Sequence, residues 1–438
     1  MEDIRFIDYF KWVGISFLVV FSFVFLGGYH IGPLSARLIV AYGLLGYVLW
    51  RGRTEYAPTM DMKMYFNYLI VYLFISLLNF SAFSVSFVKG LIAVHFVCCI
   101  AIYAFPRIFK NEVSIRAALI VLAFGFLLNA FVTFLQALNI PLGWSIGMFI
   151  NPTDIADMEE MQMELEDTDQ LEKSFIMGIM GKSVGNGYFI ATLLPVMTYY
   201  IWDKFRVKTL WTYFMFTVAA LCIFFIQQRM ALLVFLIYIL YIGIRKKISP
   251  MASILIFATI IIFLAVYLED ILYFDYSQLG RLTSTRDSVR NNTLTVLEDF
   301  IDNPLYLLLG HNQKTTAEGY FIFHTMGHNS FLDSLRMGGI FLFITYIVLF
   351  VYLCKNLINL VQFSHDEKDF RTLGLALGCL CYLLYSQTHS TGVQSGSIIF
   401  WVLYMLTIQS HRVWCESNNE EENSIEDENE ESIEMSKS

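Results

Sequence analysis

The sequence predicts an all-helical protein that crosses a membrane many times. Of its 438 residues, 57% are hydrophobic and only 15% are charged, and the mean hydropathy is +0.58. Such a composition is too apolar for a soluble domain of this length. Apolar stretches of about 17 to 25 residues recur along almost the whole chain. A stretch of this length crosses a ~30 Å hydrocarbon core as a helix.

We expect about twelve such helices, with a range from about eleven to about thirteen because the eighth and eleventh stretches are short. In order, the stretches are Trp12 to Gly28, Leu34 to Trp50, Met64 to Ala82, Phe87 to Phe105, Ala117 to Leu138, Val184 to Trp202, Leu210 to Ile226, Met230 to Ile244, Met251 to Leu268, Phe331 to Leu353, Leu373 to Tyr385 and Ser397 to Ile408. Residues 1–414 form the predicted membrane domain. Residues 415–438 are rich in Glu, Asn and Ser and lack aromatics, which predicts a disordered acidic tail.

Lys and Arg predict the orientation of the helices. With a cytoplasmic amino terminus, alternate connections collect 19 of the 29 basic residues, as expected for loops that resist translocation. Both termini are then cytoplasmic. The other ten fall on outer loops or at the outer ends of helices: Arg37, Lys89, Lys173, Lys182, Arg229, Arg281, Arg286, Arg290, Lys314 and Arg336. They are either ordinary charges at the lipid headgroups or a cationic outer surface for a lipid diphosphate, since the guanidinium fork suits phosphate.

Two outer loops are long enough to carry function. The first, about 139–182, contains an acidic stretch with near-helical apolar spacing, which predicts an amphipathic surface helix. The second, about 269–328, contains a predicted helix that begins at a capping box with Ser284 and ends before Pro304. Arg286 and Arg290 lie on its apolar side, where a cation needs an anionic partner. That partner is either a substrate diphosphate or a carboxylate of the protein.

Several other site types are excluded or unsupported. All seven cysteines lie in helices or on the cytoplasmic side, so an outer disulfide framework is not expected. His and Cys have no zinc-type spacing, and no acidic cluster resembles an EF-hand. The run GKSVGN at Gly181 is not a P-loop, because Ile176 occupies the position of the first required glycine.

A polar stripe begins the helix after the second loop. Asn329, Asp333 and Arg336 stand at i, i+4 and i+7, and His328 directly precedes them. Gly338 and Gly339 follow and permit a close approach of another helix. A single interfacial His usually has a structural role. The upstream arginines and the downstream stripe make a functional role an equal alternative here.

These residues resemble the signature of the O-antigen ligase and polymerase superfamily. In HNSFLDSLRMGG, His328, Asn329 and Gly339 match, whereas Leu342 departs from the last position. Three weaker likenesses accompany it: IQQRMALLVF with Arg229, NPLYLLLG after Arg286 or Arg290, and GNGYFIATLLP with Asn186. Together they span about Met180 to Leu353.

The resemblance implies a GT-C-like, metal-independent glycosyltransferase of the bacterial inner membrane, without a cofactor. The donor and acceptor would be glycans on undecaprenyl diphosphate, embedded among membrane lipids, with a chain-length regulator and a flippase as implied protein partners and no nucleic-acid partner. A His can take the acceptor proton, and arginines can stabilise the leaving diphosphate. The implied catalytic residues are His328, Arg290 and Arg229, and the implied substrate-binding residues are Arg286, Arg281, Asn329, Asp333, Arg336 and Lys182.

Three functions stay open. A polymerase would join repeat units into O-antigen, capsule or exopolysaccharide, and we favour it because such proteins tolerate imperfect signatures. A ligase would transfer the glycan to lipid A core. A lipid-linked oligosaccharide flippase belongs to a different class, and it would place ionisable residues and broken helices at the membrane midplane.

Overall fold

The computed structural model describes residues 6–27, 29–31, 34–51, 59–78, 88, 90–151, 176–180, 183–204, 208–226, 228–246, 300–301, 304–310, 329–387 and 392–437. Helices dominate these ranges: α1 (Phe6–Ser16), η1 (Phe17–Phe21), α2 (Ser22–Val24), α3 (Ala36–Arg51), α4 (Met60–Leu78), η3 (Leu91–His95), α6 (Phe96–Ile108), α7 (Glu112–Ala137), α8 (Pro141–Ile150), α10 (Ser183–Lys204), α11 (Lys208–Ile226), α12 (Arg229–Lys246), α16 (Pro304–Leu309), α17 (Ser330–Asp366), α18 (Phe370–Ser386), η5 (Val393–Ser395) and α19 (Ile398–Lys437). One short antiparallel pair, β1 (His30–Ile31) with β2 (Leu34–Ser35), joins α2 to α3.

The predicted all-helical membrane architecture is confirmed at this coarse level. Four helices in the described ranges are long and apolar enough to cross a membrane: Met60–Leu78, Leu91–Ile108, Glu112–Ala137 and Ser330–Asp366. Several shorter apolar helices accompany them, among them Leu210–Ile226 and Phe370–Ser386. Eleven of the twelve predicted stretches overlap helices, and the stretch Met251 to Leu268 lies outside the described residues.

Helix α17 illustrates why this bundle suits a lipid environment. Phe341, Ile344, Val348 and Val351 follow one another at intervals of three or four residues and are each more than half exposed. On the other side of the same helix, Leu342, Tyr346, Leu349 and Leu353 are completely buried. A helix that is apolar on its exposed face as well as its buried face is expected where lipid replaces water.

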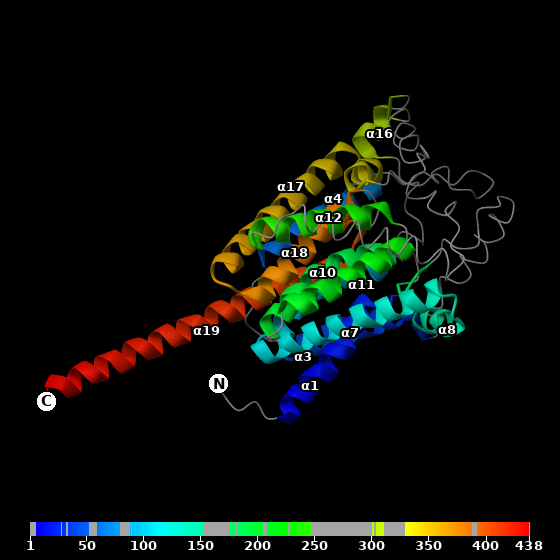
Figure 1. Ribbon diagram of the computed structural model, residues 1–438. Coiled ribbons are helices and arrows are strands. Elements are labelled where there is room, and N and C mark those ends of the chain that lie inside the picture. The colour runs from blue at the N-terminus through cyan, green and yellow to red at the C-terminus, as the bar shows by residue number, and fades with distance from the viewer. Residues whose placement is uncertain are drawn as a thin grey trace.

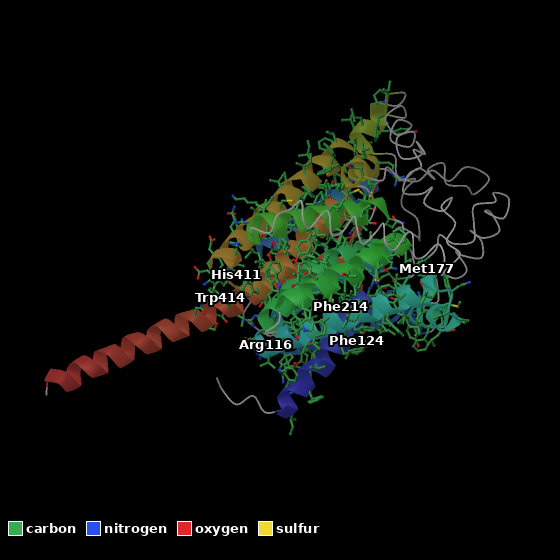
Figure 2. The ribbon with its side chains drawn as sticks, viewed as in Figure 1. Arg116, Phe124, Met177, Phe214, His411 and Trp414 are labelled. Carbon is green, nitrogen blue, oxygen red and sulfur yellow. The ribbon has the colours of Figure 1, made fainter. Side chains whose placement is uncertain are left out.

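The helices run side by side, and both chain termini lie at one end of the bundle (Figure 1). We call this the terminal end and the opposite one, where α8 and α16 lie, the distal end. Figure 2 shows Arg116, His411 and Trp414 toward the terminal end and Met177 at the distal end. Helix α18 packs against α10, α17 and α19, while α4 packs on α17 and α6 packs on α19.

Two glycines allow the closest pair of helices to meet. A methyl group on Gly378 of α18 would lie 2.8 Å from the Thr192 carbonyl oxygen of α10, and one on Gly374 would lie 3.1 Å from the Pro195 carbonyl oxygen. Small residues at a spacing of four are a common means of close helix packing in membranes. The pair α10 and α18 therefore forms a compact centre around which the other helices are placed.

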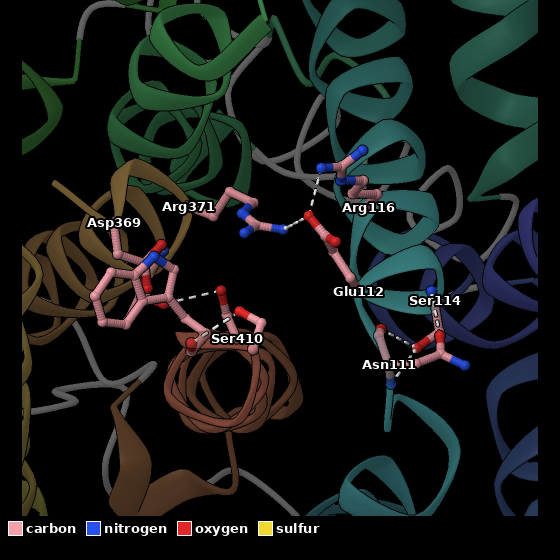
Figure 3. A network of polar contacts seen from close by, with 10 residues as sticks. Asn111, Glu112, Ser114, Arg116, Asp369, Arg371 and Ser410 are labelled. Atoms are coloured by element: carbon pink, nitrogen blue, oxygen red, sulfur yellow. Dashed lines mark hydrogen bonds and ion pairs between the residues drawn. The ribbon is translucent and has the colours of Figure 1, made fainter. Parts of the chain in front are cut away.

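Ion pairs and caps fasten the terminal end (Figure 3). Arg371 of α18 donates to Glu112 of α7 at 2.8 Å, and Arg116 donates to the same carboxylate. Thr372 of α18 donates to Ser410 of α19 at 2.8 Å. Asp369 caps α18 by accepting from the Thr372 backbone N–H, and its burial raises the pKa of the carboxyl group. These contacts tie three helices together close to the predicted cytoplasmic surface.

The tail differs from its prediction. Instead of a disordered segment, residues 415–437 continue α19 as one helix, which projects away from the bundle (Figure 1). Glutamate is a good helix former, and the nucleation cost of a helix is already met by the packed part of α19. The predicted amphipathic helix in the first outer loop lies outside the described residues, as does all but 300–301 of the predicted helix before Pro304.

Candidate functional site

The distal end of α17 carries the described part of the predicted site. Asn329 has extended backbone angles and caps the helix, its Oδ1 accepting from the N–H of Phe331 at 2.8 Å and of Leu332 at 3.3 Å. An N-cap satisfies amides that the first helical turn leaves open. His328 lies outside the described residues.

Helix α17 breaks two turns after this cap. Gly338 (φ −153°, ψ 21°) and Gly339 (φ 65°, ψ −162°) are both non-helical, so Ser330 to Met337 is a short helix set off from the long remainder. The end of α16 packs into the break: a methyl group on Gly310 would lie 2.6 Å from the Arg336 carbonyl oxygen. The predicted close approach at Gly338 and Gly339 is therefore confirmed, and it comes with a change in helix direction.

The other predicted site residues fall into three groups. Asp333 lies on the short helix with 3% of its surface exposed, and Arg336 follows one turn later, partly buried. Arg229 begins α12 at the distal end, where its backbone is described and its side chain is not. The remaining residues, Lys182, Arg281, Arg286, Arg290 and His328, lie outside the described residues. Their meeting with Asp333 thus stays a prediction.

A re-entrant turn, residues 392–397, lies beside the short helix. It joins α18 to α19 through η5, and its carbonyl groups receive hydrogen bonds from other helices: Tyr68 Oη donates to Gln394 at 3.0 Å, and Cys98 Sγ donates to Gly396 at 3.2 Å. Tyr68 is the ninth of the 19 residues of α4, about 12 Å from one end of that helix and about 15 Å from the other at ~1.5 Å per residue. The turn therefore reaches the middle of the bundle.

Irregular backbone at this depth is costly unless the protein satisfies it. Non-helical segments within a membrane occur where they are buried in protein or line a water-filled space, and they often form binding sites. Here Tyr68 and Cys98 satisfy two carbonyl groups, and Tyr382 donates to the hydroxyl of Ser397. These hydrogen bonds thus hold the re-entrant turn in place within the bundle.

The side-chain amide of Gln394, in this turn, lacks hydrogen-bond partners among the described residues. The Gln394 side chain is completely buried, and neither its Nε2 nor its Oε1 has a hydrogen-bond partner within the described part of the chain. A methyl group on Gly392 would lie 2.9 Å from both Gln394 Cδ and Ser330 Cβ, which places the amide beside the start of α17. Ser330 in turn donates to Gln387 Oε1 at 3.1 Å. A buried amide without partners costs about 1–3 kcal/mol, so this position points to a polar ligand.

A buried histidine lies on the neighbouring helices. The hydroxyl of Tyr65 is 2.9 Å from Nδ1 of His95, and the ring of Tyr72 is 5.6 Å from the imidazole. His95 ends η3, a π-helical turn that continues directly into α6. Such turns are frequent at functional sites. A methyl group on Gly396 would lie 3.3 Å from His95 Nδ1, so the histidine borders the re-entrant turn.

A second irregular segment, residues 176–180, is held by an amide cluster. Gln136 of α7 accepts from the N–H groups of Met177 and Gly178 at 3.0 and 2.9 Å. Asn129 accepts from Ile179 N–H at 2.9 Å and donates to Asn186 at 2.7 Å. Asn186 donates to Thr133 Oγ1 at 2.9 Å, so its amide is engaged on both sides. These residues, including the family-like Asn186, hold the backbone in place.

Sequence reasoning missed Gln387, Gln394 and His95. The available signal was the polar run QTHSTGVQSGS between two apolar stretches that are too short to cross a membrane fully. Short helices joined by a polar connection indicate a segment that dips into the bundle. For His95, the signal was an ionisable residue well inside the apolar stretch Phe87 to Phe105.

Within the described ranges, no group of three or more His, Cys, Asp or Glu side chains could hold a metal ion. No protein-family model matches the chain, and no curated protein matches it. The short helix of α17 and the re-entrant turn, which extend from the distal end toward the middle of the bundle, offer a buried carboxylate, two amides and a tyrosine-lined turn. Such groups hydrogen-bond neutral polar ligands such as sugars.

Proposed function

We propose that this protein is a membrane glycosyltransferase that polymerises glycan repeat units carried on undecaprenyl diphosphate. The observation that supports it best is the unpartnered amide of Gln394, which lies beside Ser330 at the start of α17. In the sequence, His328, Asn329 and Gly339 match the superfamily signature. The proposal places the reaction at the predicted outer face, where the distal end of the bundle lies.

In the proposed reaction, an acceptor sugar hydroxyl attacks the anomeric carbon of the donor glycan. His328 takes the hydroxyl proton, a new glycosidic C–O bond forms, and the bond to the diphosphate breaks with its electron pair on the departing oxygen. Arg290 and Arg229 stabilise that charge without a metal ion, with Arg281, Arg286, Arg336 and Lys182 as further cationic contacts. Asp333 and Gln394 orient sugar hydroxyl groups.

Gln394→Leu is the most informative test, because it separates a binding role from a structural one. Leucine has a similar size, and removing a buried amide that lacks partners should leave the melting temperature unchanged or raise it. We expect shorter glycan ladders in cells that carry this variant at normal protein level. Normal ladders from a stable Gln394→Leu protein would remove the site from the proposal.

His328→Ala and Arg290→Ala test the chemistry. Loss of a general base costs about 10²- to 10⁴-fold, so single lipid-linked repeats should accumulate unextended. His365→Ala and Arg412→Ala are the matched controls, since both residues are partly exposed near the terminal end and pair with local carboxylates. Chelator-sensitive activity of the purified enzyme would contradict the metal-free mechanism.

A flippase is the second candidate, and the mid-bundle position of His95 and of the re-entrant turn favours it. The two functions differ in where lipid-linked repeats accumulate in a null strain. They accumulate on the outer face if polymerisation is lost and on the cytoplasmic face if transport is lost. If the protein is instead a ligase, its loss would leave long chains on undecaprenyl diphosphate and none on lipid A core.

A further inference from the structure

Arg37 is a partly buried cation near the start of α3 whose charge the described residues do not balance. It is the second residue of α3, which starts directly after the β1–β2 hairpin. The hairpin folds α2 and α3 together, and Ala36 N–H donates to Tyr29 at 2.7 Å. This turn directs the Arg37 side chain back over Gly27. A methyl group added to Gly27 would lie 2.9 Å from the Cζ atom of the Arg37 guanidinium.

The guanidinium has polar neighbours but no anion among the described residues. Its Nε is buried without a hydrogen-bond partner, and no ion pair of the described ranges includes it. The ionisable groups that interact with it electrostatically are the phenol of Tyr188 and the thiol of Cys98. Both are ordinarily neutral at pH 7. Arginine stays protonated in proteins, so no carboxylate of the described ranges neutralises its positive charge.

The placement also opposes the helix dipole. A cation in the first turn of a helix is disfavoured, typically by about 0.3–1 kcal/mol, whereas an anion there is favoured. An arginine that only reached for the lipid headgroups would extend its charged end away from the bundle. Arg37 instead lies against the Gly27 backbone with its Nε buried. These costs are explained if an anion occupies the position next to the guanidinium.

The neighbourhood of Arg37 is connected to the re-entrant turn. Cys98 donates to the Gly396 carbonyl oxygen at 3.2 Å. The ring of Tyr188 lies 5.6 Å from that of Tyr382, whose hydroxyl donates to Ser397. Cys98 contacts Gly396 directly, and Tyr188 is connected to Ser397 through Tyr382. Both electrostatic neighbours of Arg37 are therefore linked to the last residues of the turn that carries Gln394.

We propose that Arg37 binds a phosphate-type oxyanion, and that this oxyanion belongs to the lipid diphosphate of the glycan substrate. The substrate identity rests on the proposed function, whereas the anion site rests on Arg37 itself. The planar guanidinium can donate two parallel hydrogen bonds to one phosphate group. Helix α3, from the half of the chain that lacks family-like motifs, would then contribute to substrate binding.

Binding to the full-length protein in nanodiscs tests this inference separately from catalysis. The probes are undecaprenyl diphosphate, undecaprenol, phosphatidylglycerol and inorganic diphosphate. We expect Arg37→Gln to weaken undecaprenyl diphosphate binding about ten- to hundredfold, because charge-assisted hydrogen bonds contribute about 1.5–3 kcal/mol. Arg37→Lys should recover only part of the affinity. Arg51→Gln is the matched control, since Arg51 ends the same helix, is exposed and stacks on Tyr47.

Each outcome decides a different point. Equal binding by wild type and Arg37→Gln would overturn the anion site, and so would equal binding of undecaprenol and undecaprenyl diphosphate by the wild type. An Arg37-dependent preference for phosphatidylglycerol would assign the site to a bulk lipid headgroup and overturn the substrate assignment. Arg37-dependent diphosphate binding in a protein whose deletion leaves glycan ladders intact would uphold the site and refute the polymerase. A melting temperature for each variant shows whether it is folded.

Discussion

Gly339→Ala tests whether the break in α17 is a required part of the fold. Gly339 combines φ 65° with ψ −162°, a region open almost only to glycine, which costs another residue about 1–3 kcal/mol. A methyl group at this position would also lie 2.7 Å from the backbone nitrogen of Leu309. Because that neighbour is backbone, no side-chain rotation relieves the overlap. We expect the variant to lose at least about 3 kcal/mol of unfolding free energy.

The measurement is unfolding in detergent micelles, followed by intrinsic fluorescence, with glycan ladders recorded from the same variants. Gly43→Ala is the control, because Gly43 lies within α3 with no atom within 4 Å of an added methyl group. Replacing a helical glycine with alanine stabilises by up to about 1 kcal/mol. The two substitutions should therefore shift stability in opposite directions. If Gly339→Ala is as stable as the wild type, the break is not required and α17 can run straight.

Three further predictions concern topology, the tail and pH. Single cysteines within 269–328 should react with an impermeant thiol reagent in whole cells, whereas a cysteine near Lys246 should be protected; equal protection would overturn the orientation. Truncation after Val413 should leave glycan assembly intact, because the helical extension projects away from the bundle, and a lower activity at unchanged protein level would contradict this. Burial lowers the pKa of His411 below its ordinary value, so its neutral form stabilises the fold above pH ~6.5 and that contribution is lost as the pH falls. Wild type should therefore lose more thermal stability between pH ~7.5 and pH ~5 than His411→Gln, and parallel pH curves would exclude this contribution.

Hydrophobic length alone predicted most of the helices. The predicted stretch from Phe331 begins one residue after α17 does, and the stretch from Leu210 ends with α11 at Ile226. The signal is strong because a membrane helix must satisfy the hydrogen-bonding groups of its own backbone and must present apolar side chains to lipid. The tail was mispredicted for a related reason. Composition describes an isolated segment, whereas residues 415–437 extend a helix that is already packed.

The candidate site was predicted in part. The glycine pair after Arg336 indicated a close approach, since adjacent glycines leave room for a neighbouring backbone, but their spacing does not encode the direction of the break. Gln394 could not be assigned from sequence, because its burial depends on Tyr68 and Ser330, which lie 326 and 64 positions away along the chain. A polar residue in a connection is ordinarily exposed. Only the packed helices show that this one is inside.

The distribution of irregular backbone between the two ends gives the strongest reason to place function at the distal end. In the described ranges, the terminal end uses capped helices and ion pairs, such as Arg371 with Glu112, which need little departure from regular structure. The break in α17, the amide-held segment 176–180 and the re-entrant turn instead belong to the distal half. Each of these requires specific donors or glycines to offset its cost within a membrane. Strain of this kind persists where it positions a ligand. Within the described residues, the unpartnered atoms of Gln394 and Arg37 therefore support the binding sites proposed for this half of the bundle.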